Sequence, residues 1–228
     1  THGGREMIRR APMHFFPPCS ALASTLLALL AGCRSDSMRS TASPTFAEEL
    51  AFLRAHRETL ELVAPDGRGR IAVVPEFQGR VMTSTTGGEE GPSFGFIKRE
   101  LIASRTLAKG INPYGGEDRF WLGPEGGPFS IFFAPGAPAQ TLEFWQTPAL
   151  IDSEPFELVA HDASSARFRR AARLTNHAGN EFELAIERTL EVLDARAALA
   201  ELGLDATGLE AVAFESRNTL TNAGTRPW

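Results

Sequence analysis

The stretch ARFRRAARLTNHAGNEFELAIERTLEVL, residues 166–193, decides the fold because two long extended segments flank a short turn in it. The first extended segment covers residues 166–175 and the second covers residues 180–193. Between them, Asn, His, Ala and Gly occupy positions 176–179, and this composition is typical of a turn. The stretch therefore predicts an antiparallel β-hairpin.

Further short extended segments lie on both sides of this hairpin. They cover residues 59–64, 70–74, 78–86, 119–122, 129–133 and 211–221. The five-residue loop 123–127 predicts a second hairpin, between 119–122 and 129–133. Runs of short strands without intervening helices predict a mainly β fold, an antiparallel β-sandwich in a single domain. Residues 190–204 are rich in Ala, Leu and Glu, and a helix remains the alternative there.

One short N-terminal helix is expected before the first strand. Ser43 is a suitable N-cap residue and Pro44 suits the first helical position. Phe46, Leu50 and Leu53 follow at helical spacing, so they form an apolar stripe that can pack against the domain.

The composition excludes several classes of protein. The 228 residues are 43% hydrophobic, which is too apolar for a disordered chain, and the 2 cysteines are too few for a disulfide scaffold. The net charge of −5 argues against nucleic-acid binding, which normally needs a basic surface. His56, His161 and His177 are isolated in the sequence, so we expect no metal site, and we expect no cofactor.

The first 32 residues consist of a few upstream residues, Thr1 to Glu6, followed by the pattern of a bacterial secretion signal. Met7 is followed by two arginines and then by a short apolar run, as in a signal peptide. The run ends in Leu-Ala-Gly-Cys, which resembles the lipobox of bacterial lipoproteins and predicts lipidation of Cys33. The alternative is an ordinary signal peptide with a chance cysteine.

We therefore expect three parts of the chain: residues 1–32 as the signal segment, 33–44 as a lipidated tether, and 45–228 as the β-sandwich domain. The lipid would anchor the domain to the bacterial cell envelope. Arg34 follows the cysteine, whereas Asp at that position usually retains a lipoprotein in the inner membrane. We expect the outer membrane for this reason.

The densest group of candidate functional residues lies in GEDRFWLGPEGG, residues 116–127. On a strand, Arg119 and Trp121 share one face, and a guanidinium beside an indole suits a sugar ligand. Asp118 and Glu125 can accept hydrogen bonds from hydroxyl groups, or act as acid and base catalysts. The alternative is structural: Arg119 pairs with Glu117 or Asp118, Trp121 belongs to the core, and the glycines form a turn.

Two further groups are weaker candidates for binding. Asn218 and Asn222 can present side-chain amides to hydroxyl groups, although Asn222 also suits a turn. Glu76, Gln78 and Arg80 alternate on one face, which indicates either a binding residue at Arg80 or a solvated sheet edge.

These motifs carry a resemblance to a known fold family. VVPEFQGRVMTST (73–85), GGEDRFWLGPEGG (115–127) and ESRNTLTNAG (215–224) resemble an uncharacterised family of secreted bacterial proteins. That family is similar in fold to galactose mutarotase (aldose 1-epimerase), a large antiparallel supersandwich. The resemblance implies a carbohydrate ligand bound across the concave sheet.

The chain departs from the mutarotase pattern at the catalytic residues. No histidine follows Asn218–Asn222, where a mutarotase carries its general acid, and the general-base glutamate would lie beyond Trp228. A sandwich ending after the strand 211–221 would also have an open edge. We therefore expect residues 45–228 to be the N-terminal part of a larger domain.

The expected function is that of an envelope lipoprotein with a carbohydrate-binding sandwich. Enzymatic activity on carbohydrates is a further expectation, with Asp118, Glu125 and Arg119 as candidate catalytic residues. The expected binding residues are Arg80, Arg119, Trp121, Glu125, Asn218 and Asn222. The alternative is a non-catalytic lipoprotein that binds glycan or an envelope partner.

Overall fold

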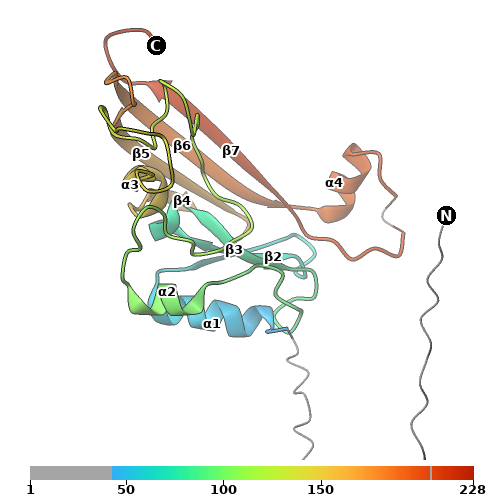
Figure 1. The fold of residues 1–228 in the computed structure, drawn as a ribbon. Helices are drawn as coiled ribbons and strands as arrows, with labels where there is room; N and C mark the ends of the chain where they lie inside the picture. The colour runs from blue at the N-terminus through green and yellow to red at the C-terminus, as the bar shows by residue number, and fades with distance from the viewer. Residues whose placement is uncertain (1–42, 206) are drawn as a thin grey trace, which may run out of the picture. The chain divides into compact units, whose positions relative to one another are not determined.

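A computed structural model describes residues 43–205 and 207–228 of the chain (Figure 1). The expected signal segment, the lipidation site at Cys33 and nearly all of the tether lie outside the described residues. The described part is mainly β, with two antiparallel sheets and a few short helices.

The first sheet has three strands in the order β1-β2-β3. These are β1 (Leu60–Val63), β2 (Arg70–Val74) and β3 (Arg80–Thr85), each of which lies within a predicted segment. A 3-10 turn, η1 (Pro75–Phe77), connects β2 to β3. Gln78 and Gly79 follow it with φ angles of 64° and 63°. Residue 80 is therefore the first one extended enough to pair, and β3 begins two residues later than predicted.

The second sheet has four strands in the order β4-β5-β6-β7. These are β4 (Glu157–His161), β5 (Ser165–Thr175), β6 (Glu181–Leu193) and β7 (Ala213–Asn222). The hairpin predicted for residues 166–193 is confirmed, since β5 and β6 pair along their length from Ser165↔Glu191 to Thr175↔Glu181. The helical alternative for residues 190–204 holds only for α4 (Ala195–Glu201), which the Asp194 side chain caps. Strand β4 was not predicted.

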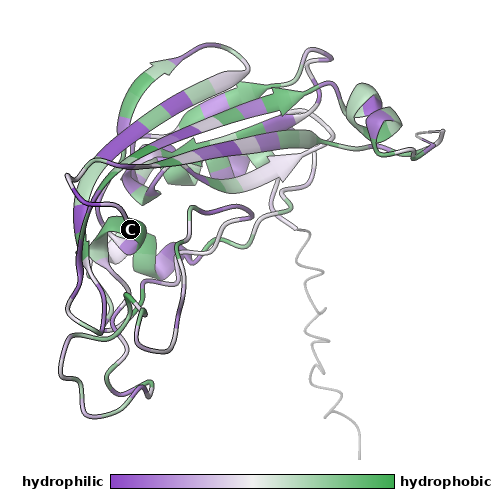
Figure 2. Ribbon diagram, turned by 90° about the horizontal axis from the view of Figure 1, so that it is seen from above, coloured by the Kyte–Doolittle hydropathy of each residue, from purple (hydrophilic) through white to green (hydrophobic). Residues whose placement is uncertain are grey.

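The second sheet has one apolar face and one charged face, which appear as alternating stripes along its strands in Figure 2. On β6, buried side chains occur at every second position: Leu184, Ile186, Arg188, Leu190 and Val192. We call the face that carries them the inner face. Its apolar residues share one hydrophobic core with residues of the first sheet, an arrangement compatible with a sandwich.

The N-terminal helix α1 (Phe46–His56) is confirmed, but its N-cap is Thr45 and not Ser43. The Thr45 hydroxyl accepts a hydrogen bond from the Glu48 N–H, and the Glu48 carboxylate accepts one from the Thr45 N–H. This reciprocal pair satisfies two backbone donors, which an N-cap at Ser43 would leave without partners. Phe46, Leu50 and Leu53 are buried as predicted, in a second apolar cluster that also includes residues of β2 and β3.

A long irregular segment joins β3 to β4 and contains two short helices, α2 (Arg99–Ser104) and α3 (Ala149–Asp152). Helix α2 lies beside α1 in Figure 1, and Arg99 of α2 forms an ion pair with Glu49 of α1 at 3.0 Å. None of the helices within residues 43–205 and 207–228 is long and apolar enough to span a membrane.

The hairpin predicted between residues 119–122 and 129–133 is wrong, because neither segment forms a strand and the backbone beside or within each pairs elsewhere. The backbone of Asp118 pairs with Val81 of β3. The second segment meets the β5–β6 turn, where the His177 N–H donates to the Ser130 carbonyl at 2.7 Å. Aromatic side chains of both segments, including Phe120 and Phe132, are buried in the core. The apolar pattern therefore reflects burial and not a strand ladder.

Candidate functional site

A buried arginine connects three parts of the chain at the inner face of the second sheet. Arg188 of β6 is 0% exposed. Its Nε donates to the Gly79 carbonyl at 3.2 Å and its Nη1 donates to Asn218 Oδ1 of β7 at 2.9 Å. Its Nη2 forms an ion pair with Asp118 Oδ2. Each guanidinium nitrogen thus has a partner, which offsets the cost of burying the charge.

Two of these partners reach the surface. The Asp118 side chain is 27% exposed, and Asn218 is exposed. Arg188 uses one oxygen of each side chain. The second carboxylate oxygen of Asp118 and the amide nitrogen of Asn218 form no hydrogen bond within the described part of the chain. The Asp118–Arg188–Asn218 group therefore presents a carboxylate oxygen as an acceptor and an amide nitrogen as a donor. The buried guanidinium of Arg188 holds both side chains in place.

The position of Asp118 is set by its contacts with β3. The Val81 N–H donates to the Asp118 carbonyl at 3.0 Å, and the Glu117 N–H donates to the Val81 carbonyl at 2.8 Å. The Glu117 carboxylate then accepts hydrogen bonds from the Ser84 N–H at 2.8 Å and from the Ser84 hydroxyl at 2.7 Å. These bonds hold Asp118 against a buried strand although it belongs to no strand itself.

Position 79, whose carbonyl accepts a hydrogen bond from Arg188, requires a glycine. Its φ of 63° lies in the left-handed region, and a Cβ there would lie 2.8 Å from the ring of Phe168. A side chain at position 79 would push against a buried ring of β5. The glycine therefore lets the backbone carbonyl come close enough to accept the hydrogen bond from Arg188.

Arg119 and Trp121 lie together, as predicted, but the guanidinium covers the indole. The Arg119 guanidinium carbon is 4.0 Å from the centroid of the Trp121 ring, and its Nη2 donates to the Ile151 carbonyl at 2.7 Å. Burial lowers the pKa of Arg119, and the nearby Asp152 opposes this effect. The ring face beneath the guanidinium is thus already occupied, and a sugar cannot stack on it.

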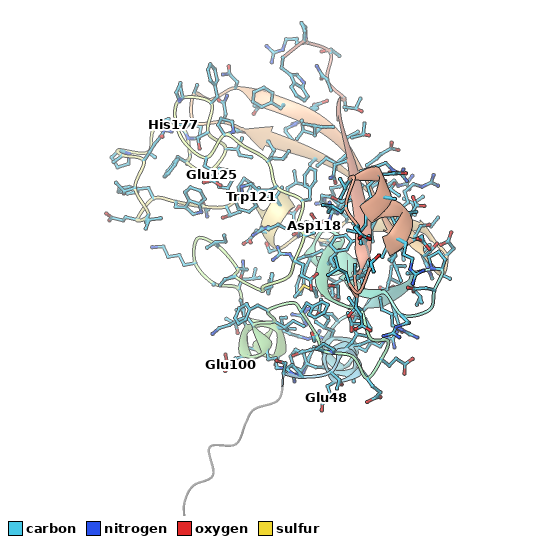
Figure 3. All side chains as sticks on the ribbon, turned by 90° about the vertical axis from the view of Figure 1, so that its right-hand side faces the viewer. Glu48, Glu100, Asp118, Trp121, Glu125 and His177 are labelled. Atoms are coloured by element: carbon cyan, nitrogen blue, oxygen red, sulfur yellow. The ribbon has the colours of Figure 1, made fainter. Side chains whose placement is uncertain are left out.

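Glu125 lies beside the indole on the surface. Trp121 Nε1 donates to Glu125 Oε1 at 2.9 Å, while the ring of Phe132 lies 5.2 Å from that of Trp121. In the view of Figure 3, Trp121 lies between Asp118 and Glu125. Trp121 is thus hydrogen-bonded to Glu125, whereas Asp118 and Glu125 do not contact each other through a hydrogen bond.

Arg80 is buried, so the solvated-edge interpretation of its pattern is wrong. Its side chain is 1% exposed, and Nη1 donates to the Gly115 carbonyl at 3.0 Å. Burial, together with the charge of Arg119, lowers the pKa of Arg80 to about 10. A guanidinium this deeply buried supports the segment around Gly115 from below and does not reach a surface ligand.

The structure does not bring Asn222 to this group. Its amide Nδ2 donates to the Arg226 carbonyl at 2.7 Å, and its Oδ1 accepts from the Gly224 N–H at 2.9 Å. These bonds close the chain after β7, as the turn alternative predicted.

Two buried charged residues were missed from the sequence, Arg188 and Asp152. The signal for Arg188 was present, because it interrupts a row of apolar residues at alternate positions of β6. Asp152 accepts hydrogen bonds from the backbone N–H and the side-chain amide of Asn112, at 3.0 and 2.6 Å to the same oxygen. Nothing in the local sequence around residue 152 indicated this pairing, since Asn112 lies 40 residues away.

The Asp118–Arg188–Asn218 group is thus the arrangement best suited to contact a polar ligand. In a comparison with known proteins, the model of a family described as of unknown function, DUF6786, matches residues 44–228. No curated protein and no solved structure matches the chain.

Proposed function

Because the chain belongs to DUF6786, a family of unknown function, its role has to be argued from the site, and we propose that it binds carbohydrate. The ligand would contact Asp118 and Asn218 on the inner face of the second sheet. The observation that carries the proposal is the buried Arg188, which bonds to both side chains and leaves one polar atom of each exposed.

The chemistry of the exposed atoms suits sugar hydroxyl groups. A hydroxyl both donates and accepts hydrogen bonds, so it pairs with a carboxylate oxygen and an amide nitrogen at once. The bond to the carboxylate is charge-assisted and therefore stronger than a neutral one. Asp118 and Asn218 together can thus bind two neighbouring hydroxyl groups, or one hydroxyl from both sides.

Preorganisation adds to this argument. A side chain that must be ordered on binding reduces affinity, whereas one held by buried partners does not. Arg188 has no exposed surface, and Asp118 is also held through its backbone by β3. The two ligand-facing groups are therefore in place before a ligand arrives.

The fold and the location form part of the same proposal. We propose that the two sheets belong to a supersandwich of the galactose mutarotase type, on the resemblance of residues 73–85, 115–127 and 215–224. We also propose that a lipid on Cys33 holds the domain at the bacterial envelope, in the outer membrane. The support for the anchor is the Leu-Ala-Gly-Cys sequence.

A carbohydrate-active enzyme is the second candidate function. It is favoured by the second oxygen of Asp118, which is free to exchange a proton with a bound sugar. Glu125 is less suited to this role, because its carboxylate accepts a hydrogen bond from Trp121.

Titration calorimetry with a panel of monosaccharides and their methyl glycosides tests the binding proposal. We expect Asn218→Ala to weaken binding about tenfold, the value of roughly one lost hydrogen bond, and Asp118→Asn to weaken it at least as much. Asn222→Ala is the matched control, because this residue lies on the same strand and bonds only to the chain after it. Equal binding by all three variants, or no binding of any sugar by the wild type, would refute the proposal.

Anomer exchange followed by NMR separates binding from catalysis. If Asp118 exchanges protons with a sugar, the wild type accelerates exchange of an aldose that it binds and Asp118→Asn does not. A wild type that binds sugar without accelerating exchange would rule out the mutarotase activity and leave the binding function.

A further inference from the structure

An apolar pocket with a volume of about 280 Å³ lies against the inner face of the second sheet. The irregular segment before β4 forms one wall, and strands β5, β6 and β7 form the other. Its lining includes Leu122, Phe129, Ile131, Phe182, Leu184 and Leu220. Within the described part of the chain no charged residue lines it, so its chemistry differs from that of the Asp118–Arg188–Asn218 group.

Several of these side chains are open to solvent. Phe129 is 63% exposed and Leu220 is 41% exposed. Exposed apolar residues that line one concave pocket gain free energy when a ligand covers them. A sugar ring alone carries hydroxyl groups around its edge and would therefore bury only part of this apolar surface.

The pocket and the polar group lie along the same two strands, β6 and β7. On β7, Leu220 follows Asn218 by two residues, so both point to the same face and lie about 7 Å apart along the strand. On β6, Leu184 lies on the same face as Arg188, with Ile186 between them. The polar group and the apolar pocket are therefore neighbours on one face.

We infer that the ligand is amphipathic: a glycoside whose sugar contacts Asp118 and Asn218 and whose apolar aglycone, an alkyl, acyl or aryl group, fills the pocket. The inference rests on the proposed carbohydrate binding and specifies its ligand class. The size of the pocket favours an aglycone over a protein partner. Its volume is close to the lower end of small-molecule sites, about 300–1,000 Å³, and it is concave where a protein interface is commonly flat and larger.

A series of alkyl glycosides of increasing length tests the inference. The probes are methyl, butyl, hexyl and octyl β-D-glucopyranoside and the matching galactosides, below their micelle concentrations, titrated into the full chain. Each methylene buried is expected to tighten binding about fourfold, until the pocket is filled. Affinity independent of chain length would overturn the inference but leave the carbohydrate-binding function, provided that the methyl glycosides bind.

Variants in the pocket identify where the alkyl chain binds. We expect Leu220→Ser to remove most of the dependence on chain length while the methyl glycoside binds as before. Thr219→Ser, on the opposite face of β7, is the matched control. If circular dichroism shows that Leu220→Ser has lost its fold, Phe129→Ser on the other wall serves the same purpose. Unchanged chain-length dependence in a folded pocket variant would overturn the inference.

Two controls distinguish other occupants of the pocket. If octanoate binds as tightly as the octyl glycosides, and Asp118→Asn has no effect on either, the pocket takes a lipid without a sugar and both proposals fail. If light scattering shows a dimer that Leu220→Ser dissociates, and the glycosides bind without regard to length, a second copy covers the pocket and the inference is overturned.

Discussion

Arg188 is a single guanidinium in a row of aliphatic side chains, and its neighbours show why it can be there. The positions before and after it on the inner face of β6 are Ile186 and Leu190, which are buried. A charge in such a place is stable only when its partners are also present. Removing the arginine would leave the Asp118 carboxylate and the Gly79 carbonyl without their donor.

Replacement of Arg188 therefore tests the most important contact of the site. Arg188→Met fills a similar volume without a charge, and we expect the free energy of unfolding to fall by about 3 kcal/mol. Urea denaturation followed by circular dichroism measures the loss. Arg169→Met is the control, because Arg169 forms its ion pair with Glu157 at the surface, where both side chains are exposed, and it should change stability far less. A similar loss in both variants would contradict the role given to Arg188.

The elements of this fold differ in how far the local sequence determines them. The β5–β6 hairpin was predictable because both strands and the turn between them are local. In the turn, the Asn176 side chain accepts from the Asn180 N–H at 2.9 Å, and Gly179 has a φ of 83°. Residues 119–122 and 129–133 do not form the predicted hairpin because the chain beside or within each of them pairs with a segment distant in sequence. Asp118 pairs with Val81, and Ser130 accepts from the His177 N–H of the β5–β6 turn.

The β1–β2 turn allows a prediction of pH dependence. Hydrogen bonds from the backbone N–H groups of Arg68 and then Gly69 lower the pKa of Asp66 below its ordinary value of 3.8. A carboxylate with a lowered pKa stabilises the folded state above the unfolded-state pKa. This contribution is lost as the pH falls through the folded-state pKa.

We therefore expect Asp66→Asn to unfold at a lower temperature than the wild type near neutral pH, with a difference that shrinks as the pH falls below about 4. Thermal denaturation over a pH series measures the difference. Glu143→Gln serves for comparison, because Glu143 is exposed and has no hydrogen bond in residues 43–205 or 207–228. A difference between Asp66→Asn and wild type that stays constant with pH would show that the charge is unimportant.

At the scale of the described molecule, the two sheets depend on one core. Phe168 of β5 is fully buried, and it shares the core with Ile71 and Val81 of the first sheet and with Phe120 of the irregular segment. The site depends on the same assembly: Gly79, Asp118 and Asn218 come from separate parts of the chain. Such a combination could not be predicted from sequence, since no single segment contains two of the three.

Replacement of Phe168 should thus affect both sheets together. Phe168→Ala removes a fully buried ring, and we expect a loss of about 3–5 kcal/mol in the free energy of unfolding. Arg167→Ala, on the exposed face of the same strand, is the control. Circular dichroism follows the sheets. Tryptophan fluorescence, measured in a Trp228→Phe background, follows the irregular segment, which contains the other two tryptophans, Trp121 and Trp145. Two separate transitions in the variant would contradict a shared core.

The close approach at Gly79 has a consequence for how this protein can change. One atom of the residue, its carbonyl oxygen, orients the arginine of the site, while the missing side chain makes room for the ring of Phe168. A substitution here alters ligand recognition and core packing in the same step. Evolution or design that aims to change affinity has more freedom at Asn218, at the surface, than at this glycine, where gains in one property are tied to losses in the other.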